Sequence, residues 1–198
     1  MKLEAINLSL FQSLNAPDGF SGAPLALAIA ACKYPVVILL ALLAFLWMKR
    51  IQRDRAFLIS IGLAVVVALA INYVVGAAFP HPRPFMVGLG RTFLPHVAES
   101  SFPSDHATLM WTIAFGLLLH SSLRAWGWLA ALLAAVTSWA RVFLGLHFPF
   151  DILGSVMAAV SALALLSPMR PWIERKIAPV VEGLYLRTMI WIRQGLAR

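Results

Sequence analysis

Charged residues and cysteines are both scarce in this 198-residue chain. Only 12% of the residues are charged, whereas about a quarter is usual in a soluble domain. The single cysteine, Cys32, lies within an apolar stretch, so no intrachain disulfide can form. The sequence also lacks internal repeats and low-complexity segments. These absences exclude a soluble globular domain and a disulfide-stabilised scaffold.

Long apolar runs take the place of the missing charges, and hydrophobic residues make up 61% of the chain. Five runs approach or exceed the roughly 20 residues that cross a hydrocarbon core of about 30 Å. They cover residues 25–48, 56–79, 104–119, 125–146 and 148–166. We therefore expect an all-α integral membrane bundle of about five to six transmembrane helices, in a single domain over residues 1–198.

The two ends of the chain differ from this transmembrane core, which covers residues 24–167. Residues 1–20 carry Glu4 and Asp18 and lack the basic and apolar regions of a signal peptide. Their apolar spacing predicts a short interfacial helix. Residues 171–198 carry charges too often for an easy span, with apolar residues between them. We predict an amphipathic helix on the cytoplasmic membrane surface there.

The basic residues predict how the chain is oriented in the membrane. Four of the seven residues in the segment KRIQRDR, 49–55, are Lys or Arg, so the positive-inside rule makes this segment cytoplasmic. Alternation of the spans then places the N-terminus, the loop 80–103 and the turn 147–150 outside. The net charge of +8 follows from basic residues beside the apolar runs and does not call for a nucleic-acid partner.

Three polar clusters fall on this outer side. The first is HPRPF, 81–85, and the second is SSFPSDH, 100–106. The third consists of Arg141, His147 and Asp151, at the junction of the last two spans. Unrelated solvated loops would have no reason to collect these residue types on one face. We therefore expect one extracytoplasmic active site built from all three clusters.

The arginines and one serine of these clusters indicate phosphate binding. Phosphoryl transfer needs fixed positive charge around the equatorial oxygens, and arginine supplies it with a planar fork of donors. Arg83 and Arg141 are the two arginines in the clusters. Ser104 adds a hydroxyl, and a helix that begins there would also direct its first backbone N–H groups at an anion.

Two histidines complete the chemistry. His147 and Asp151 are four residues apart, so Asp151 can accept the protonated ring nitrogen and leave the other nitrogen free to attack phosphorus. His106, in the first turn of the span 104–119, is placed to protonate the leaving oxygen. The alternatives are a structural His–Asp pair and a plain helix-start histidine. A metal site is a further alternative, but the two arginines would repel a cation.

These motifs resemble the type 2 phosphatidic acid phosphatase superfamily across roughly residues 70–160. The strings HPRPF, SSFPSDHA and RVFLGLHFPFD resemble in particular its bacitracin-resistance-type undecaprenyl-diphosphate phosphatases. The resemblance implies an enzyme of the bacterial cytoplasmic membrane that converts undecaprenyl diphosphate to the monophosphate. We expect a phosphohistidine intermediate, no metal and no other cofactor. The expected partners are the lipid substrate and membrane lipid, and the sequence sets no oligomeric state.

The resemblance is incomplete at one position. The wider family has a lysine seven residues before the arginine of its first motif, and that position here is Gly76. His81 or Lys33 could take the place of this ligand, although Lys33 could also extend to the membrane surface. Asp105 stands where glycine is commoner in the wider family, and we predict no catalytic role for it.

Other functions remain as alternatives. The substrate could be another lipid phosphate, such as phosphatidic acid, phosphatidylglycerophosphate or a lipid A phosphate. A lipid transporter without chemistry would need polar residues at both membrane faces, and inverted repeats are absent. A structural membrane subunit would not need His106, His147 and Asp151 together.

Overall fold

The computed structural model describes residues 2–49 and 52–196, and all regular structure within them is helical. Two residues of the KRIQRDR segment, Arg50 and Ile51, lie outside the described residues. The elements are α1 (Lys2–Leu14), α2 (Gly22–Lys49), α3 (Gln52–Ala78), the 3-10 helix η1 (Pro84–Val87), α4 (Asp105–Leu118), α5 (Arg124–Phe143), α6 (Pro149–Leu166), α7 (Arg170–Trp172), the π-helical turn η2 (Ile173–Ile177) and α8 (Ala178–Leu196). The expected all-α class is confirmed.

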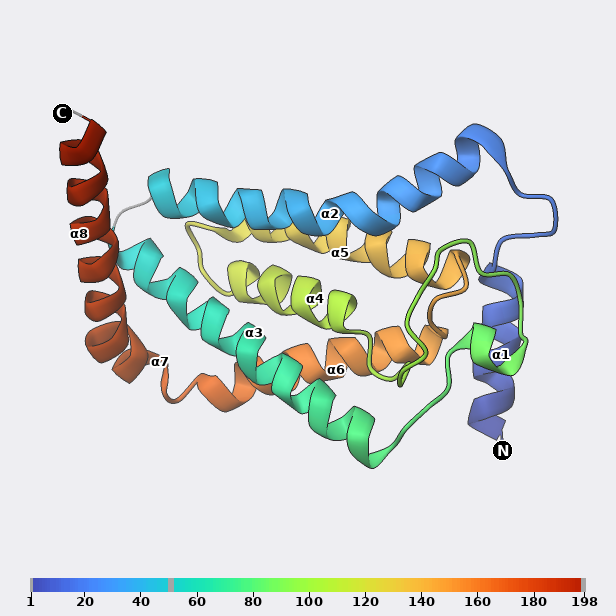
Figure 1. The fold of residues 1–198 in the computed structure, drawn as a ribbon. Coiled ribbons are helices and arrows are strands. Elements are labelled where there is room, and N and C mark those ends of the chain that lie inside the picture. Colours follow the sequence, from blue (N-terminus) through green and yellow to red (C-terminus); the bar gives the residue numbers. More distant parts are fainter. Residues whose placement is uncertain (1, 50–51, 197–198) are drawn as a thin grey trace.

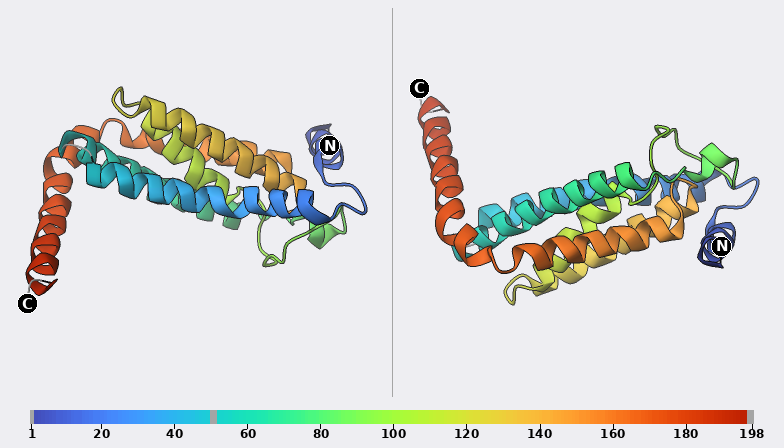
Figure 2. Two further views of the ribbon diagram at one scale, coloured as in Figure 1. Left: turned by 90° about the horizontal axis from the view of Figure 1, so that it is seen from above. Right: turned by 90° about the horizontal axis from the view of Figure 1, so that it is seen from below.

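Helices α2 to α6 form a bundle, and α1 and α8 lie across its opposite ends (Figures 1 and 2). The loops that carry the three polar clusters all lie at the end with α1, which is the predicted outer end (Figure 1). At the predicted inner end, Arg55 pairs with Glu182 at 3.2 Å and so ties α8 to α3. The transverse direction of α1 and α8 agrees with helices that lie along a membrane surface.

Within residues 2–49 and 52–196, four helices are long and apolar enough to cross a membrane, namely α2, α3 from Asp54 onward, α5 and α6. The span expected at 104–119 forms α4, which has only 14 residues and is therefore about 21 Å long. A turn at the inner end joins it to the 20-residue α5, which is about 30 Å long. Helix α4 therefore begins about 9 Å short of the outer end of α5. The preceding loop must enter the bundle to reach it.

Close packing holds α4 at the centre of the bundle, between α3, α5 and α6. Transmembrane helices associate through van der Waals packing, because lipid tails are as apolar as the side chains. Small residues on α5 allow α4 to approach closely, and a Cβ atom on Gly127 would lie 2.7 Å from the backbone nitrogen of Leu118. The inner half is filled by apolar side chains that include Leu39, Leu46, Phe57, Ile61, Met110, Ile113 and Leu117. The outer half is left for polar groups.

Candidate active site

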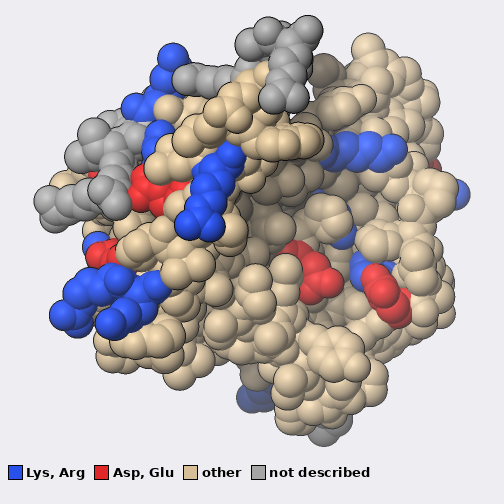
Figure 3. Space-filling model, turned by 60° about the vertical axis from the view of Figure 1, so that its left-hand side comes forward, with Lys and Arg blue, Asp and Glu red and all other residues tan. Residues whose placement is uncertain are grey.

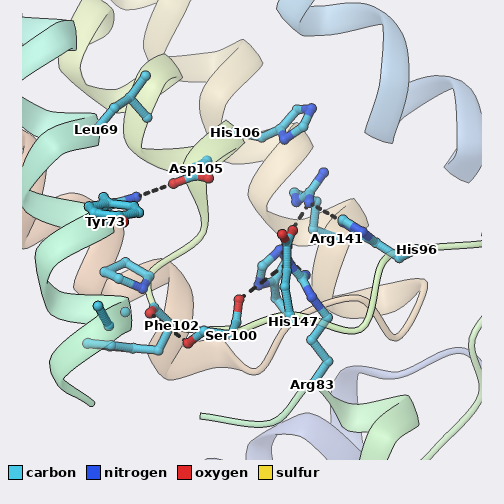
Figure 4. Close-up of a pocket in the computed structure, with 15 residues that line it drawn as sticks. Leu69, Tyr73, Arg83, His96, Ser100, Phe102, Asp105, His106, Arg141 and His147 are labelled. Carbon is cyan, nitrogen blue, oxygen red and sulfur yellow. Dashed lines mark hydrogen bonds and ion pairs between the residues drawn. The ribbon is translucent and has the colours of Figure 1, made fainter. Parts of the chain in front are cut away.

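Two arginines converge on one ring nitrogen of a histidine. The Nη1 atom of Arg83 and the Nη2 atom of Arg141 each lie 3.0 Å from Nε2 of His147. All three residues are at least 95% buried. Figure 4 shows their side chains pointing toward one another at the base of a cavity. The two expected phosphate ligands and the expected nucleophile are therefore brought together.

The other ring nitrogen of His147 faces acceptors. Its Nδ1 atom lies 3.0 Å from the backbone carbonyl oxygen of Ser101 and 3.3 Å from Oδ2 of Asp151. The hydroxyl of Ser101 also donates a hydrogen bond to that carboxylate. Because a carbonyl oxygen only accepts, Nδ1 must carry the proton and Nε2 must carry the lone pair. The sequence predicted the contribution of Asp151 to this arrangement but missed Ser101.

A tight turn after α5 sets the spacing of Arg141 and His147. Arg141 lies in the last turn of α5, and the chain reverses through Gly145, whose φ of 76° is left-handed. A Cβ atom at Gly145 would lie only 2.1 Å from the carbonyl oxygen of Arg91. Glycine is therefore required there for both its backbone conformation and its close contact with the outer loop.

Ser104 lies at the N-cap position of α4, but its side chain does not cap the helix. Its backbone N–H donates to Oγ of Ser155 at 2.9 Å, so this N–H group does not face an anion as expected. Within the described part of the chain, three buried groups of the site lack a hydrogen-bond partner: Oγ of Ser104 and the Nε atoms of Arg83 and Arg141. Buried donors of this kind call for an acceptor, and an anion such as phosphate would supply it.

The cavity that Arg83 and Arg141 line has a volume of about 510 Å³. Its lining residues are Leu69, Asn72, Tyr73, Gly76, Ala77, Arg83, His96, Glu99, Ser100, Phe102, Pro103, Asp105, His106, Arg141 and His147. His106 projects from the first turn of α4 toward this space (Figure 4). It is exposed and makes no hydrogen bond among the residues that the structure describes. Such a side chain is free to meet a substrate atom.

The two candidates for the missing lysine lie in different places. His81 has Nε2 3.9 Å from a carboxylate oxygen of Glu4, and its ring meets Phe148 edge to face, so it does not line the cavity. Lys33 is exposed on α2 and lines an adjoining cavity of about 430 Å³ together with His106 and Arg141. The structure therefore brings Lys33, but not His81, next to the site.

Gly76 itself lines the larger cavity from α3. A Cβ atom there would lie 3.3 Å from the carbonyl oxygen of Phe102. The segment before α4 therefore packs closely against α3 at the position where the wider family has a lysine.

Two loop residues that no sequence motif singled out also belong to the site. Glu99 accepts a hydrogen bond from Nη2 of Arg83 at 3.1 Å, and Nε2 of His96 lies 3.2 Å from Nη2 of Arg141. No pattern distinguishes such residues in a polar loop from neighbours that face water. Ser155 could have been noticed, because it lies four residues after Asp151 and thus on the same helix face.

The two histidines that contact arginines are held neutral. Burial lowers the pKa of His147 to about 3, although its hydrogen bond with Asp151 acts in the opposite direction. Burial, followed by the charges of Arg83 and Arg141, lowers the pKa of His96 to about 4. A neutral His147 near pH 7 retains the lone pair that a nucleophile needs.

Helix α1 braces the turn that carries His147. The side-chain oxygen of Asn7 accepts a hydrogen bond of 3.1 Å from the backbone N–H of Phe150, in the first turn of α6. The rings of Phe11 and Phe148 meet edge to face, with centroids 5.1 Å apart. Phe148, at the N-cap of α6, offers no side-chain acceptor, so Asn7 supplies from α1 the cap that α6 lacks.

An apolar hollow lies deeper in the bundle than the polar site, beginning about one helical turn further inward. A cavity of about 380 Å³ between α2, α3 and α4 is lined by Leu40, Leu43, Ala44, Trp47, Leu58, Ile59, Ile61, Gly62, Val65, Leu109 and Ile113. In the space-filling view, acidic and basic side chains lie close together beside a hollow with mostly uncharged surroundings, and further charged side chains gather at the left of the view (Figure 3). A ligand with a charged head and an apolar tail would fit such a surface.

Several known proteins with similar sequences are named as undecaprenyl-diphosphatases. Residues 57–175 match the family model described as the PAP2 superfamily. The chain is 36% identical to YbjG of Escherichia coli (strain K12) over 192 residues, which cover 96% of this chain and 92% of the relative. It is 27% identical to the undecaprenyl-diphosphatase BcrC of Bacillus subtilis (strain 168), over 78% of this chain and 79% of the relative.

Two solved structures share the fold. LpxE of Aquifex aeolicus superposes with a TM-score of 0.59 and 24% identity, over 80% of this chain and 95% of LpxE. A PAP2-type phosphatidylglycerolphosphate phosphatase of Bacillus subtilis also superposes with a TM-score of 0.59, at 19% identity, over 88% and 89% of the two chains. At these identities the likeness concerns the helical fold.

Proposed function

The chain belongs to the PAP2 superfamily and is a multi-pass membrane lipid phosphatase, and from this premise we propose that it hydrolyses undecaprenyl diphosphate to undecaprenyl phosphate and phosphate. The relative BcrC, which is named an undecaprenyl-diphosphatase, supports this substrate. The apolar hollow, which lies further inward along the bundle than the polar cavity, offers space for part of a long prenyl chain.

The observation that carries the proposal is the position of His147. Its Nδ1 faces two acceptors, while its Nε2 faces two guanidinium groups at 3.0 Å. A terminal phosphate that displaces the arginine N–H groups from Nε2 would keep them as ligands of its own oxygens. The nucleophile and the charge that stabilises the transition state would then meet at one phosphorus atom.

The reaction proceeds in two transfers. The lone pair of Nε2 of His147 attacks the terminal phosphorus, the bond to the bridging oxygen breaks, and His106 gives its proton to the departing lipid phosphate. His106, now neutral, takes a proton from a water molecule, whose oxygen attacks the phosphohistidine. The P–N bond breaks, phosphate leaves, and both histidines return to their initial states.

Positive charge for these steps comes from the protein rather than from a metal. Arg83 and Arg141 each lie 3.0 Å from Nε2. The buried hydroxyl of Ser104, which has no hydrogen-bond partner among the described residues, is the third expected phosphate ligand. Two fixed guanidinium groups stabilise the charge of a phosphoryl group during transfer and repel a divalent cation. The reaction therefore requires no cofactor.

The site faces the outside of the bacterial cytoplasmic membrane. The 49–55 segment, which is rich in basic residues, joins α2 to α3 at the end of the bundle opposite the site. The positive-inside rule makes that end cytoplasmic, which supports an outer position for the site. Residues 1–198 act as one domain, with α1 and α8 along the two membrane surfaces. A reporter enzyme active only outside the cytoplasm should work when inserted in the loop 86–98 and fail in the segment 49–55. The reverse pattern would place the site on the cytoplasmic face.

Phosphate release by the purified protein tests the substrate. Undecaprenyl diphosphate, undecaprenyl phosphate, phosphatidic acid and phosphatidylglycerophosphate should be compared at equal surface concentration in detergent, with a chelator present. We expect the highest kcat/KM for undecaprenyl diphosphate. We expect no turnover of any of these lipids by His147→Ala. A preference for a glycerophospholipid would overturn the proposed substrate while leaving the lipid phosphatase class intact.

A further inference from the structure

His106 forms part of the wall of two adjoining cavities. The larger contains His147 and Arg83, and the smaller contains Lys33. His96, His106 and Arg141 line both. A residue that protonates the bridging oxygen of a diphosphate must lie between the two phosphoryl groups. The shared position of His106 therefore divides the site into a place for each phosphate.

The two cavities differ in charge. The larger is lined by two carboxylates, Glu99 and Asp105, in addition to its arginines. Asp105 is held toward α3 by a hydrogen bond of 2.8 Å from the side-chain amide of Asn72. None of the described residues that line the smaller cavity is acidic, and Lys33 and Arg141 supply two positive charges there. A second phosphate would be repelled by Asp105 on one side and attracted by Lys33 on the other.

We propose that the smaller cavity is the subsite for the lipid-linked phosphate of a diphosphate substrate, with Lys33 as its cationic ligand. The inference rests on the proposed function, because it assumes that the terminal phosphate lies at His147. It adds a residue that selects diphosphates over monophosphates, since a monophosphate places no second charge beside Lys33.

The position of Lys33 along α2 supports this assignment. It lies eleven residues after Gly22, the first residue of α2, and so about 16 Å along the helix. A lysine at such a depth in an apolar span is costly and is a mark of function when it faces a polar cavity. The flexible ammonium group of lysine suits a phosphate whose position shifts as the bridging bond breaks.

The test compares two substrates that have the same prenyl tail and differ only in the number of phosphates. Farnesyl diphosphate and farnesyl monophosphate are given to the wild type, Lys33→Met and Lys33→Arg in the same detergent. We expect Lys33→Met to lower the diphosphate-to-monophosphate ratio of kcat/KM by about 10-fold or more, the loss typical of one charge-assisted phosphate contact. Lys33→Arg should keep most of the ratio. The matched control is Lys49→Met, at the far end of the same helix, which should leave both rates as in the wild type.

Inhibition by inorganic pyrophosphate and phosphate gives a second measure that does not depend on the lipid. Lys33→Met should weaken inhibition by pyrophosphate and leave inhibition by phosphate nearly as it was. Retained phosphate inhibition also shows that the variant is folded. An unchanged substrate ratio together with unchanged pyrophosphate inhibition would overturn the subsite, as would an equal loss for both substrates. Failure of the wild type to hydrolyse undecaprenyl diphosphate, measured in parallel, would instead refute the proposed function.

Discussion

The Nδ1 atom of His147 lies 3.0 Å from the backbone carbonyl oxygen of Ser101. This contact sets the tautomer of the ring even without a carboxylate, because a carbonyl oxygen has no proton to give. Asp151, with Oδ2 3.3 Å from the same nitrogen, adds negative charge that stabilises the ring when it becomes cationic on attack. The structure thus separates orientation, which both groups supply, from charge, which only Asp151 supplies.

This separation predicts unequal effects of two substitutions. Asp151→Asn should lower kcat by about 10²-fold or more, because the attacking ring loses its counter-charge. Ser101→Ala keeps the carbonyl and removes only a hydroxyl bond to Asp151, so its loss should be about 10-fold or less. Steady-state kinetics on one lipid diphosphate measures both. Equal losses would mean that the hydroxyl of Ser101 matters as much as the charge of Asp151, which would contradict this separation.

A second prediction concerns the brace from α1. Asn7→Ala removes the acceptor for the N–H of Phe150 and should lower stability by about 1 kcal/mol, as the loss of a helix cap does. It should also reduce kcat more than it raises KM, since α6 carries Asp151. Asn7→Asp retains an acceptor and should restore both. Thermal unfolding in detergent and kinetics are the two measurements, with the exposed Glu4→Gln as control. A stability loss with unchanged kcat would limit α1 to a structural role.

Much of this fold could be predicted from hydropathy alone. The run expected at 25–48 is α2 (Gly22–Lys49), and the run expected at 148–166 is α6 (Pro149–Leu166). Hydropathy predicts these helices well because lipid offers no hydrogen-bond partners, so every backbone polar group in a span must be paired within a helix. Hydropathy did not predict that α4 would begin inside the bundle, short of the outer end of α5. Whether a 14-residue helix reaches one surface depends on how it packs against its neighbours.

The site was predicted where its residues lie in regular spacing and missed where a loop supplies them. His147 and Asp151 are one helical turn apart, so their pairing follows from local geometry. Ser101, His96 and Glu99 reach the site only because the loop before α4 enters the bundle. That path depends on contacts between segments distant in sequence, such as the hydrogen bond from the backbone N–H of Ser101 to the carbonyl oxygen of His81.

The neutral state of His96 predicts a loss of stability in acid. Its pKa is about 4 in the folded protein and about 6.5 when unfolded, so only the unfolded state binds the proton between these values. Stability should therefore fall as the pH drops from about 6.5 toward 4, because protonation of His96 then favours the unfolded state. His96→Gln cannot take up the proton and should flatten the decline. Thermal midpoints in detergent from pH 4 to 8 would show it, and parallel curves for both proteins would contradict it.

In the first phosphoryl transfer, His106 is predicted to matter only when the leaving group needs a proton. His106→Ala should slow release of phosphate from a lipid diphosphate by about 10² to 10⁴-fold. With an aryl phosphate, whose leaving group departs unprotonated, the first phosphoryl transfer should be largely restored. Burst kinetics on both substrates separates this transfer from later hydrolysis. An equal defect in the burst on both substrates would remove His106 from the role of general acid.

The most direct test of the central claim is to trap the phosphoryl group on His147. A lipid diphosphate labelled in its terminal phosphate is mixed with enzyme and excess chelator and quenched in base, where phosphohistidine survives. We predict label on a peptide that contains His147, loss of the label on brief acid treatment, and no label on His147→Ala, whose turnover is also abolished. Substantial turnover by His147→Ala would contradict the account. So would activity that the chelator abolishes and a divalent cation restores, because a metal-activated water would then be the nucleophile.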